Sequence, residues 1–423
     1  MSEFAIEGRP TVAVPKSSYF STFCIGLLIV NLCAFLYHFL GAQVFNAVGN
    51  AVSLAIIAYS IQIIMQSKRE EGAAKGYLLV ALVTTTLSVI YNLQVASMTD
   101  ALKYLSIYVF YAAGRATGGK MKPIELRCIV ALGIVPILFL LTKGSSKVYE
   151  NESFASEVFS YFPNANTGVL YFSALLFAVT QLYGNRVILF QFINAIVMNK
   201  LGAAVATAVA SCLWIVMPIR SSSIVALIAV GVGGAVALSV GALDRGIATF
   251  DNLMLVFSMD PSAIASMSYK QLVTMTGSTD LSAFFRLIHW TDIWNVYSSQ
   301  GTGVFLFGYG SGQTALVTYA ALVAHNDYLR ILVEYGLINL AIFAPFLIHV
   351  YRSLPVGATR VLFVVLCIYF FSENLLDNFT SMALYFAYAG RASVMHGSRS
   401  GAQVSVRKRA RYISRETDEE EFV

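Results

Sequence analysis

Charged side chains are scarce in this 423-residue chain. Lys, Arg, Asp and Glu make up 12% of the residues and apolar side chains 57%, whereas a soluble domain carries roughly 25% charged residues. This balance excludes a disordered chain, a coiled coil and an ordinary cytosolic enzyme. The apolar runs between charge clusters are about 20 residues long, the length of a helix that crosses about 30 Å of hydrocarbon. The sequence therefore predicts an all-α, polytopic membrane bundle.

Several motifs that would name an enzyme class are also missing. The chain has no Asp-x-Asp pair for a nucleotide-sugar metal, no Walker loop, no HExxH and no GxSxG. Its five cysteines lie inside apolar runs without CxxC spacing, so neither a disulfide nor a metal site is expected. We expect no cofactor. The net charge of +5 is interpreted as membrane topology, and no nucleic-acid partner is expected.

About twelve membrane spans are expected from the apolar runs. Residues 1–18 are predicted to be a cytoplasmic segment, 19–260 to hold nine spans, 261–324 to form an outer loop with an amphipathic helix, 325–395 to hold three more spans, and 396–423 to be a disordered cytoplasmic tail. The most clearly bounded spans are 19–40, 42–65, 77–95, 100–114, 124–142, 168–183, 328–350, 356–372 and 379–395.

Loop charge sets the predicted sides, because Lys and Arg in short loops mark the cytoplasmic face. The loop after the second span holds Lys68 and Arg69, so the amino terminus lies inside. The run 187–199 is only 13 residues long, and we interpret it as an interfacial or re-entrant element with Lys200 inside and Arg220 outside. The alternative counts 187–199 as a span and moves Arg220 to the opposite face.

The densest group of polar residues starts at His325. Asp327, Arg330 and Glu334 would share one helix face, and the last two can pair at i, i+4. His325 and Asn326 would stand at the helix start, where free N–H groups favour an anion. Ionisable residues at membrane depth are candidate sites, although a structural ion pair is an open alternative for Arg330 and Glu334.

A second group lies in the predicted outer loop. Arg286, Trp290 and Trp294 repeat every four residues and would share a helix face. A guanidinium beside indole rings suits a sugar diphosphate, because the first binds phosphate and the second stacks on a pyranose. An interfacial amphipathic helix with tryptophan at headgroup level is the alternative.

Two further elements are weaker. Arg220 stands between two apolar runs, where a lone arginine also occurs simply as a boundary residue. Asn164 and Asn166 stand at the predicted outer start of a span, where a helix cap is the alternative to a binding role.

Taken in chain order, these motifs resemble the O-antigen ligase/polymerase superfamily of bacterial envelope glycosyltransferases. The resemblance covers roughly residues 160–395, and the block from His325 to Gly336 is its most specific part. The matching pieces are Pro163-Asn164-x-Asn166, Arg220-Ser221, Arg286 with Trp290, Gly308-x-Gly310-x-Gly312, His325-Asn326-x-Tyr328-Leu329 and Glu334-x-Gly336. The chain departs from the usual pattern at Ile219, where serine is usual, and at Ala165, where proline is usual.

The resemblance implies a metal-independent glycosyltransferase of the bacterial inner membrane with a periplasmic active site. Loop charge separately predicts that both termini lie in the cytoplasm. The donor would be a glycan on undecaprenyl diphosphate, and the other expected partners are membrane lipid, a chain-length regulator and a flippase. In a polymerase the acceptor is another lipid-linked repeat unit, and in a ligase it is lipid A-core. The compact outer loop and the Asn-Asp-Tyr-Leu-Arg form of the last motif favour an O-antigen or exopolysaccharide polymerase; the ligase stays open.

Residue roles follow from the same resemblance. Arg220 and Arg286 would clamp the diphosphate. His325 would orient or deprotonate the acceptor hydroxyl, or contact the diphosphate. The expected substrate-binding residues are Trp290, Trp294, Asn326, Tyr328, Arg330, Glu334, Asn164 and Asn166. A transporter of a lipid-linked sugar is the alternative from another class. It predicts ionisable residues near mid-membrane in several spans and an internal repeat. In this sequence the polar residues gather at one predicted face, and no repeat is visible.

Overall fold

The structure is a helical bundle with a smaller group of helices at one end. The computed structural model describes residues 19–67, 72–92, 98–144, 160–198, 200–215, 269–277, 282–318 and 322–395, with isolated positions between 254 and 267, and no strand occurs in these parts. The bundle helices are α1 (Tyr19–Leu40), α2 (Gln43–Gln66), α3 (Gly72–Asn92), α4 (Met98–Thr117), α5 (Pro123–Lys143), α6 (Ala165–Tyr183), α7 (Arg186–Val197), α8 (Leu201–Ile215), α16 (Asp327–Ser353), α17 (Ala358–Ser372) and a last helix over 379–395.

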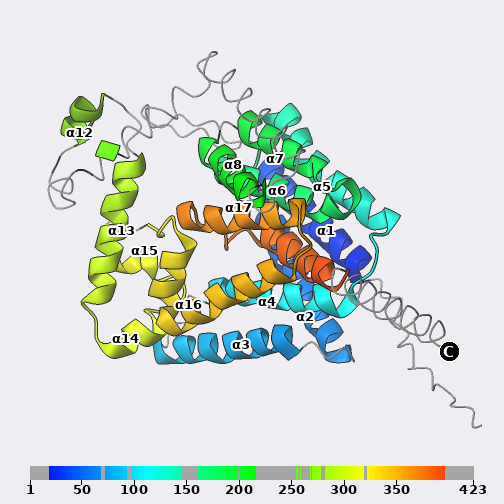
Figure 1. Cartoon of the computed structure of the whole chain (residues 1–423), viewed down its shortest axis with the longest axis horizontal. Coiled ribbons are helices and arrows are strands. Elements are labelled where there is room, and N and C mark those ends of the chain that lie inside the picture. The colour runs from blue at the N-terminus through cyan, green and yellow to red at the C-terminus, as the bar shows by residue number, and fades with distance from the viewer. Residues whose placement is uncertain are drawn as a thin grey trace, which may run out of the picture.

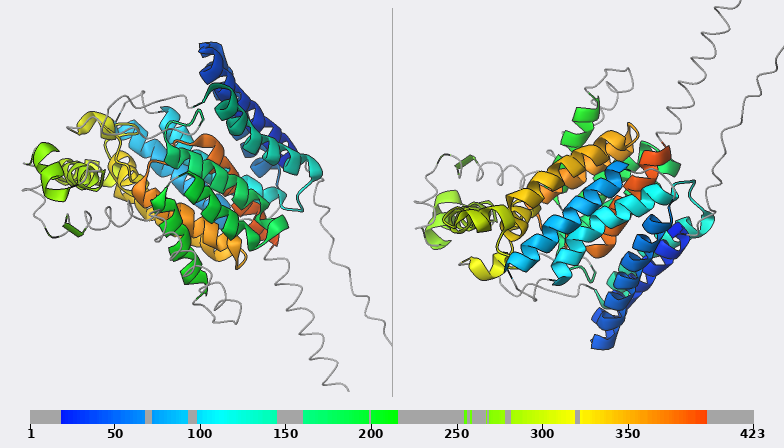
Figure 2. Two further views of the ribbon diagram at one scale, coloured as in Figure 1. Left: turned by 90° about the horizontal axis from the view of Figure 1, so that it is seen from above. Right: turned by 90° about the horizontal axis from the view of Figure 1, so that it is seen from below.

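The smaller group holds α12 (Tyr269–Thr276), α13 (Ser282–Ser298), α14 (Thr302–Phe307) and α15 (Thr314–Val317). In Figure 1, α3, α4 and α16 run alongside one another, and α13 lies across their left-hand ends. Both views in Figure 2 show α13 and α14 at one end of the bundle.

Helix length and composition confirm an all-α membrane bundle. Six described helices, α1, α2, α3, α5, α6 and α16, are long and apolar enough to cross a membrane. Their outward side chains include Met65 and Leu141, which are 81% and 76% exposed; lipid tails can cover such surface, while the helical backbone satisfies its own hydrogen bonds. Four predicted features lie wholly or mostly outside the described residues: Arg220, the spans that the sequence predicts at 221–243 and 246–260, and the tail 396–423. Of these, only isolated positions from 254 to 258 are described.

Close backbone contact joins α4 to the last helix. A Cβ atom on Gly114 would lie 2.0 Å from the carbonyl oxygen of Ala387, and one on Gly390 would lie 2.1 Å from that of Tyr111. Small residues at such crossings let membrane helices pack tightly. These two helices therefore form the centre of the bundle.

The short helix α7 returns along α6. Asn194 donates to the carbonyl oxygen of Val169 at 3.0 Å, and Ser173 donates to Gln191 at 2.7 Å. Past the end of α7, Met198 comes close to Gly168. Lys200 therefore lies at the same end of the bundle as the start of α6. This arrangement fits the alternative that counts 187–199 as a span, and differs from the interfacial interpretation, which separated Lys200 from the start of α6.

Helix α16 is broken at Gly336, whose φ of 80° and ψ of 175° are not helical. The loop 308–310 fills the break: Tyr309 N donates to Val333 O at 2.8 Å and Gly310 N to Glu334 O at 2.9 Å. These bonds satisfy carbonyls that the break would otherwise leave open.

Two glycines make this contact sterically allowed. A Cβ on Gly336 would lie 2.1 Å from Leu306 O, and one on Gly308 would lie 2.4 Å from the backbone of Glu334. Both glycines also have positive φ. The Gly-x-Gly-x-Gly and Glu-x-Gly motifs are therefore two sides of one backbone contact.

Candidate active site

A carboxylate that the sequence analysis did not single out lies at the centre of the candidate site. Glu373 caps the end of α17 and is 5% exposed. Its Oε1 accepts hydrogen bonds from Arg286 Nη2, at 2.8 Å, and from Asn166 Nδ2. Its Oε2 lies 3.8 Å from His325 Nδ1. Three of the residues named from sequence, on three separate segments, thus meet at one acidic side chain.

The group reaches the surface of the protein. The side chains of Arg286 and His325 are 33% and 34% exposed, against 7% for Glu373. A ligand that approaches the bundle would reach the guanidinium and the imidazole first. We call this the Glu373 end of the bundle; it comprises the starts of α4, α6 and α16 and the end of α17.

Helix α13 carries Arg286 and is fastened to the chain just before His325. Trp290 Nε1 donates to Ala324 O at 2.6 Å, and the Trp290 ring packs edge-on against Phe371 with centroids 5.4 Å apart. His289 Nε2 lies 3.2 Å from Val323 O. The Trp290 side chain therefore contacts Ala324 and Phe371 of the protein itself.

Trp294 lies one helical turn farther along α13. It is 49% exposed, and its ring centroid lies 6.2 Å from that of Tyr297. Its exposed face remains open for a sugar or for lipid headgroups.

His325 is held in an unusual backbone conformation, with φ of 47°. L-residues other than glycine rarely adopt this region, and such strain gathers at functional sites. The next residue, Asn326, caps α16 by accepting a hydrogen bond from Leu329 N at 3.0 Å. The cap fixes where α16 begins and so fixes His325 beside Glu373.

Two residues of α16 hold the loop that presents Glu373. Asp327 Oδ2 accepts hydrogen bonds from Leu375 N at 2.6 Å and Leu376 N at 3.2 Å. Arg330 Nη1 pairs with Asp377 Oδ2 at 2.7 Å. The loop 373–377 is thus tied to α16 at two points.

Charge around Asp377 favours its ionised form. Burial alone would raise the pKa of Asp377, but Arg330 and Lys103 outweigh it and hold the pKa below its ordinary value. Lys103 lies 3.6 Å from Asp377 and 3.2 Å from Asp100. This network links the start of α4 to the loop that carries Glu373.

The predicted pair on α16 is present. Arg330 Nε lies 3.2 Å from Glu334 Oε1, and Arg330 Nη2 lies 3.4 Å from Asp100 Oδ2. Glu334 also accepts a hydrogen bond from Thr314 at 2.9 Å. Both Arg330 and Glu334 are buried, at 4% and 0% exposure. Their surroundings fit the structural alternative better than contact with a substrate.

Two other residues named from sequence have local partners. Asn164 caps α6 and accepts hydrogen bonds from Thr167 N at 2.8 Å and Thr167 Oγ1 at 2.9 Å. Tyr328 donates to Cys367 O at 2.9 Å and so joins α16 to α17. Of the Asn-x-Asn pair, Asn166 alone reaches the group around Glu373.

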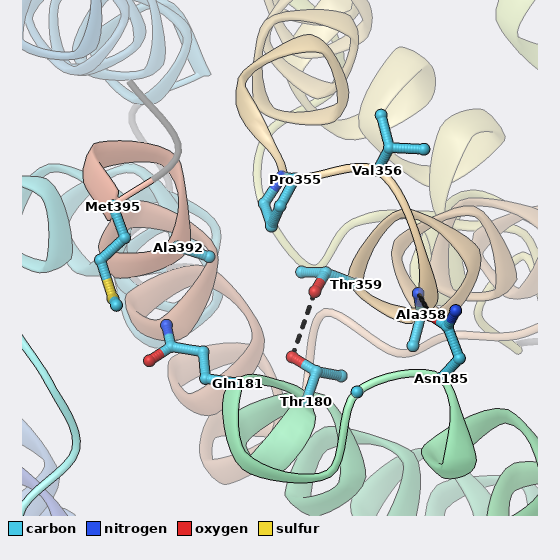
Figure 3. A pocket seen from close by; sticks show the side chains of 10 residues that line it. Thr180, Gln181, Asn185, Pro355, Val356, Ala358, Thr359, Ala392 and Met395 are labelled. Carbon is cyan, nitrogen blue, oxygen red and sulfur yellow. Dashed lines mark hydrogen bonds between the residues drawn. The ribbon is translucent and has the colours of Figure 1, made fainter. Parts of the chain in front are cut away.

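The opposite end of the bundle has a different character. Arg391 Nη1 pairs with Glu125 Oε2 at 2.6 Å, both side chains are buried, and the Arg391 guanidinium lies 4.2 Å from the Phe20 ring centroid. A half-open pocket of about 210 Å³ lies at this end, between the end of α6 and the start of α17. Thr180 and Thr359 hydrogen-bond across it at 3.2 Å, as Figure 3 shows, and the residues that line it are uncharged. Of the residues named from sequence that the structure describes, Arg286, His325 and Asn166 lie at the Glu373 end.

A weak signal of Glu373 exists in the sequence. It is one of two acidic residues, with Asp377, in the polar turn between two apolar runs, and a carboxylate at the end of a span is a candidate functional residue. Its partners, however, lie 87 and 207 positions away along the chain. No local pattern could have joined them.

No protein-family model matches this chain, and no curated protein matches it in sequence. The family resemblance therefore rests on the motifs alone.

Proposed function

We propose that this protein is a membrane glycosyltransferase that moves a glycan from undecaprenyl diphosphate to a sugar hydroxyl, as a polysaccharide polymerase at the periplasmic face of the bacterial inner membrane. The observation that carries the proposal is the meeting of Arg286, His325 and Asn166 at Glu373. Arg286 supplies a cation for the leaving diphosphate, and His325 supplies a base for the acceptor hydroxyl. The two side chains lie beside the same carboxylate, and both are partly exposed at the protein surface.

The proposed reaction needs one bond exchange and one proton transfer. The acceptor oxygen forms a bond to the anomeric carbon of the donor, and the bond from that carbon to the diphosphate oxygen breaks. The electron pair leaves with undecaprenyl diphosphate. The hydroxyl proton goes to His325 Nε2, because the other ring nitrogen, Nδ1, faces Glu373 at 3.8 Å.

Each side chain then has a separate task. Arg286 neutralises charge that grows on the diphosphate, so it favours the transition state over the ground state. Glu373 stabilises the imidazolium that forms on His325. A base held in this way contributes on the order of 10²–10⁴-fold to the rate. Asn166 helps to orient Glu373.

The distribution of charge supports an enzyme over a transporter. Among the described residues, the buried ion pairs gather near the two ends of the bundle, around Arg330 at one and Arg391 at the other. A transport pathway would instead favour ionisable groups near the middle of several spans.

The test is complementation of a gene deletion by the wild type, His325→Ala or Arg286→Ala. Surface and lipid-linked glycans are resolved by length on a gel, and the membrane level of each variant is measured. Arg352→Ala, at the far end of α16, is the matched control and should restore the wild-type pattern.

The outcomes separate the candidate functions. Collapse of a ladder to a single-repeat product supports the polymerase. Loss of capped species while long lipid-linked polymer accumulates would assign the ligase activity instead. An unchanged ladder, with both variants at wild-type level, would contradict the proposed active site.

A further inference from the structure

We propose that the Glu373 carboxylate occupies the position on Arg286 that the donor diphosphate takes, so that donor binding replaces an internal ion pair. This inference rests on the proposed function and adds an order of events to it. Arg286 is held by Glu373 until the diphosphate arrives, and only then does Glu373 act fully on His325.

The donors around Glu373 are suited to a phosphate as well as to a carboxylate. A guanidinium, an amide and an imidazole surround it from Arg286, Asn166 and His325. Guanidinium groups bind both anions through paired N–H donors. Here Arg286 uses Nη2 alone, and among the described residues its Nη1 and Nε make no hydrogen bond. The guanidinium therefore has donors left for a second anion.

Exposure sets the direction from which that anion comes. Arg286 and His325 are each about one-third exposed, whereas Glu373 lies behind them. A diphosphate carries more charge than a carboxylate and can accept a two-pronged contact from Arg286. It can therefore compete with Glu373 for the same guanidinium without entering the bundle.

The backbone around the pair is fixed, so the exchange needs only side-chain movement. Asp327 and Arg330 tie down the loop 373–377. Trp290 and His289 fasten α13 to the segment before His325. The Arg286 side chain is one-third exposed, so it can turn outward while the loop and α13 stay in place.

The exchange has a consequence for the base. When Arg286 turns to the diphosphate, Glu373 loses its strongest cationic partner and keeps His325, now 3.8 Å away. A carboxylate without a competing guanidinium stabilises an imidazolium more strongly. Glu373 is then left to pair with the imidazolium that forms when His325 takes the acceptor proton, which orders donor binding before acceptor activation.

The inference predicts a gain in binding that accompanies a loss in turnover. Glu373→Gln keeps the size of the side chain and its hydrogen bond to Asn166 but removes the charge that competes for Arg286. Binding of undecaprenyl diphosphate to the purified full-length protein in lipid nanodiscs should tighten on the order of tenfold, while glycan transfer falls. Arg286→Gln should weaken binding, and the double variant should bind like Arg286→Gln alone.

Asp292→Asn is the matched control, because it removes one negative charge from α13, the helix that carries Arg286. It should leave the affinity for undecaprenyl diphosphate unchanged. Thermal unfolding of each variant confirms that the compared proteins are folded.

Failure of this inference is distinguishable from failure of the proposed function. If the wild type binds undecaprenyl diphosphate and Glu373→Gln binds it no more tightly, the inference is overturned and the glycosyltransferase proposal stands. Equal tightening by Asp292→Asn would also overturn it, since general charge would then explain the gain. A wild type that does not bind undecaprenyl diphosphate would overturn the proposed function itself.

Discussion

At the residue scale, the two tryptophans of α13 differ in what they contact. The indole N–H of Trp290 donates to Ala324 O at 2.6 Å, next to His325, whereas Trp294 is 49% exposed. Trp290→Phe should therefore lower stability by about 1 kcal/mol, the usual worth of one hydrogen bond, and lower activity by loosening His325. Trp294→Phe should leave the thermal midpoint unchanged. Thermal unfolding in detergent and glycan transfer measure both effects, and equal midpoints for the two variants would contradict the assignment.

The ion pair of Asp377 with Arg330 predicts a pH-dependent loss of stability. The pKa of Asp377 is held below its ordinary value of 3.8, so its stabilising charge is fully present above that pH and is lost as pH falls through the lower folded-state pKa. Asp377→Asn should unfold at a lower temperature than the wild type at pH 7. The difference should narrow as the pH drops below 3.8. A constant difference from pH 7 to pH 3 would show that the carboxylate charge is not what stabilises the loop.

For single residues, the sequence predicted contacts within one helix but not contacts between distant segments. The i, i+4 pair of Arg330 and Glu334 followed from spacing, because both members lie on one helix. The role of Glu373 did not, because it depends on chain segments that meet only in the folded bundle. Asn164 and Asn166 stand two positions apart, yet one caps a helix and the other reaches Glu373, a difference that requires the orientation of α6.

At the element scale, the break in α16 is the feature most sensitive to substitution. Gly336→Ala would bring a Cβ atom 2.1 Å from Leu306 O at a residue with φ of 80°. Strain and backbone overlap together should cost more than about 2 kcal/mol, and the membrane level of the variant should fall. Gly41→Ala is the matched control: its φ is 73°, but a Cβ there has nothing within 4 Å.

The two glycine variants are compared by membrane level and thermal midpoint. Gly41→Ala should lose only the conformational part, about 1 kcal/mol. If Gly336→Ala lost no more than Gly41→Ala, the loop would not be packed into the break as described.

Helix positions were largely predictable, and the contacts between helices were not. The first expected span, 19–40, coincides with α1, and the span expected at 328–350 lies within α16. Apolar runs with polar ends carry this information directly. The break at Gly336 could not be predicted, because the sequence around this glycine does not show that the loop 308–310 packs against it. The packing of α7 along α6 could not be predicted either, since the short length of the run 187–199 favoured an interfacial helix.

At the scale of the whole molecule, the two ends of the bundle should respond independently to substitution. The buried pair of Arg391 with Glu125 lies at the end away from Glu373. Glu125→Ala leaves a buried guanidinium unpaired and should cost about 3–5 kcal/mol. The double variant Glu125→Met with Arg391→Met should recover much of that loss, because apolar side chains then replace both charges.

The pair of Arg391 with Glu125 also tests whether activity at the Glu373 end depends on the opposite end of the bundle. Transfer activity per folded molecule should be unchanged in the double variant, with the folded amount taken from the monodisperse peak in detergent. A double variant that is folded but inactive would show that the two ends are coupled.

The central claim is that the residues around Glu373 carry out glycan transfer, and Glu373→Gln tests it most directly because geometry alone identified this residue. The measurement is the length distribution of lipid-linked and surface glycans in a deletion strain complemented by the wild type, Glu373→Gln or Asp292→Asn. With all three proteins at equal membrane levels, we predict a wild-type ladder for Asp292→Asn and loss of the ladder for Glu373→Gln. A wild-type ladder from Glu373→Gln would contradict the account.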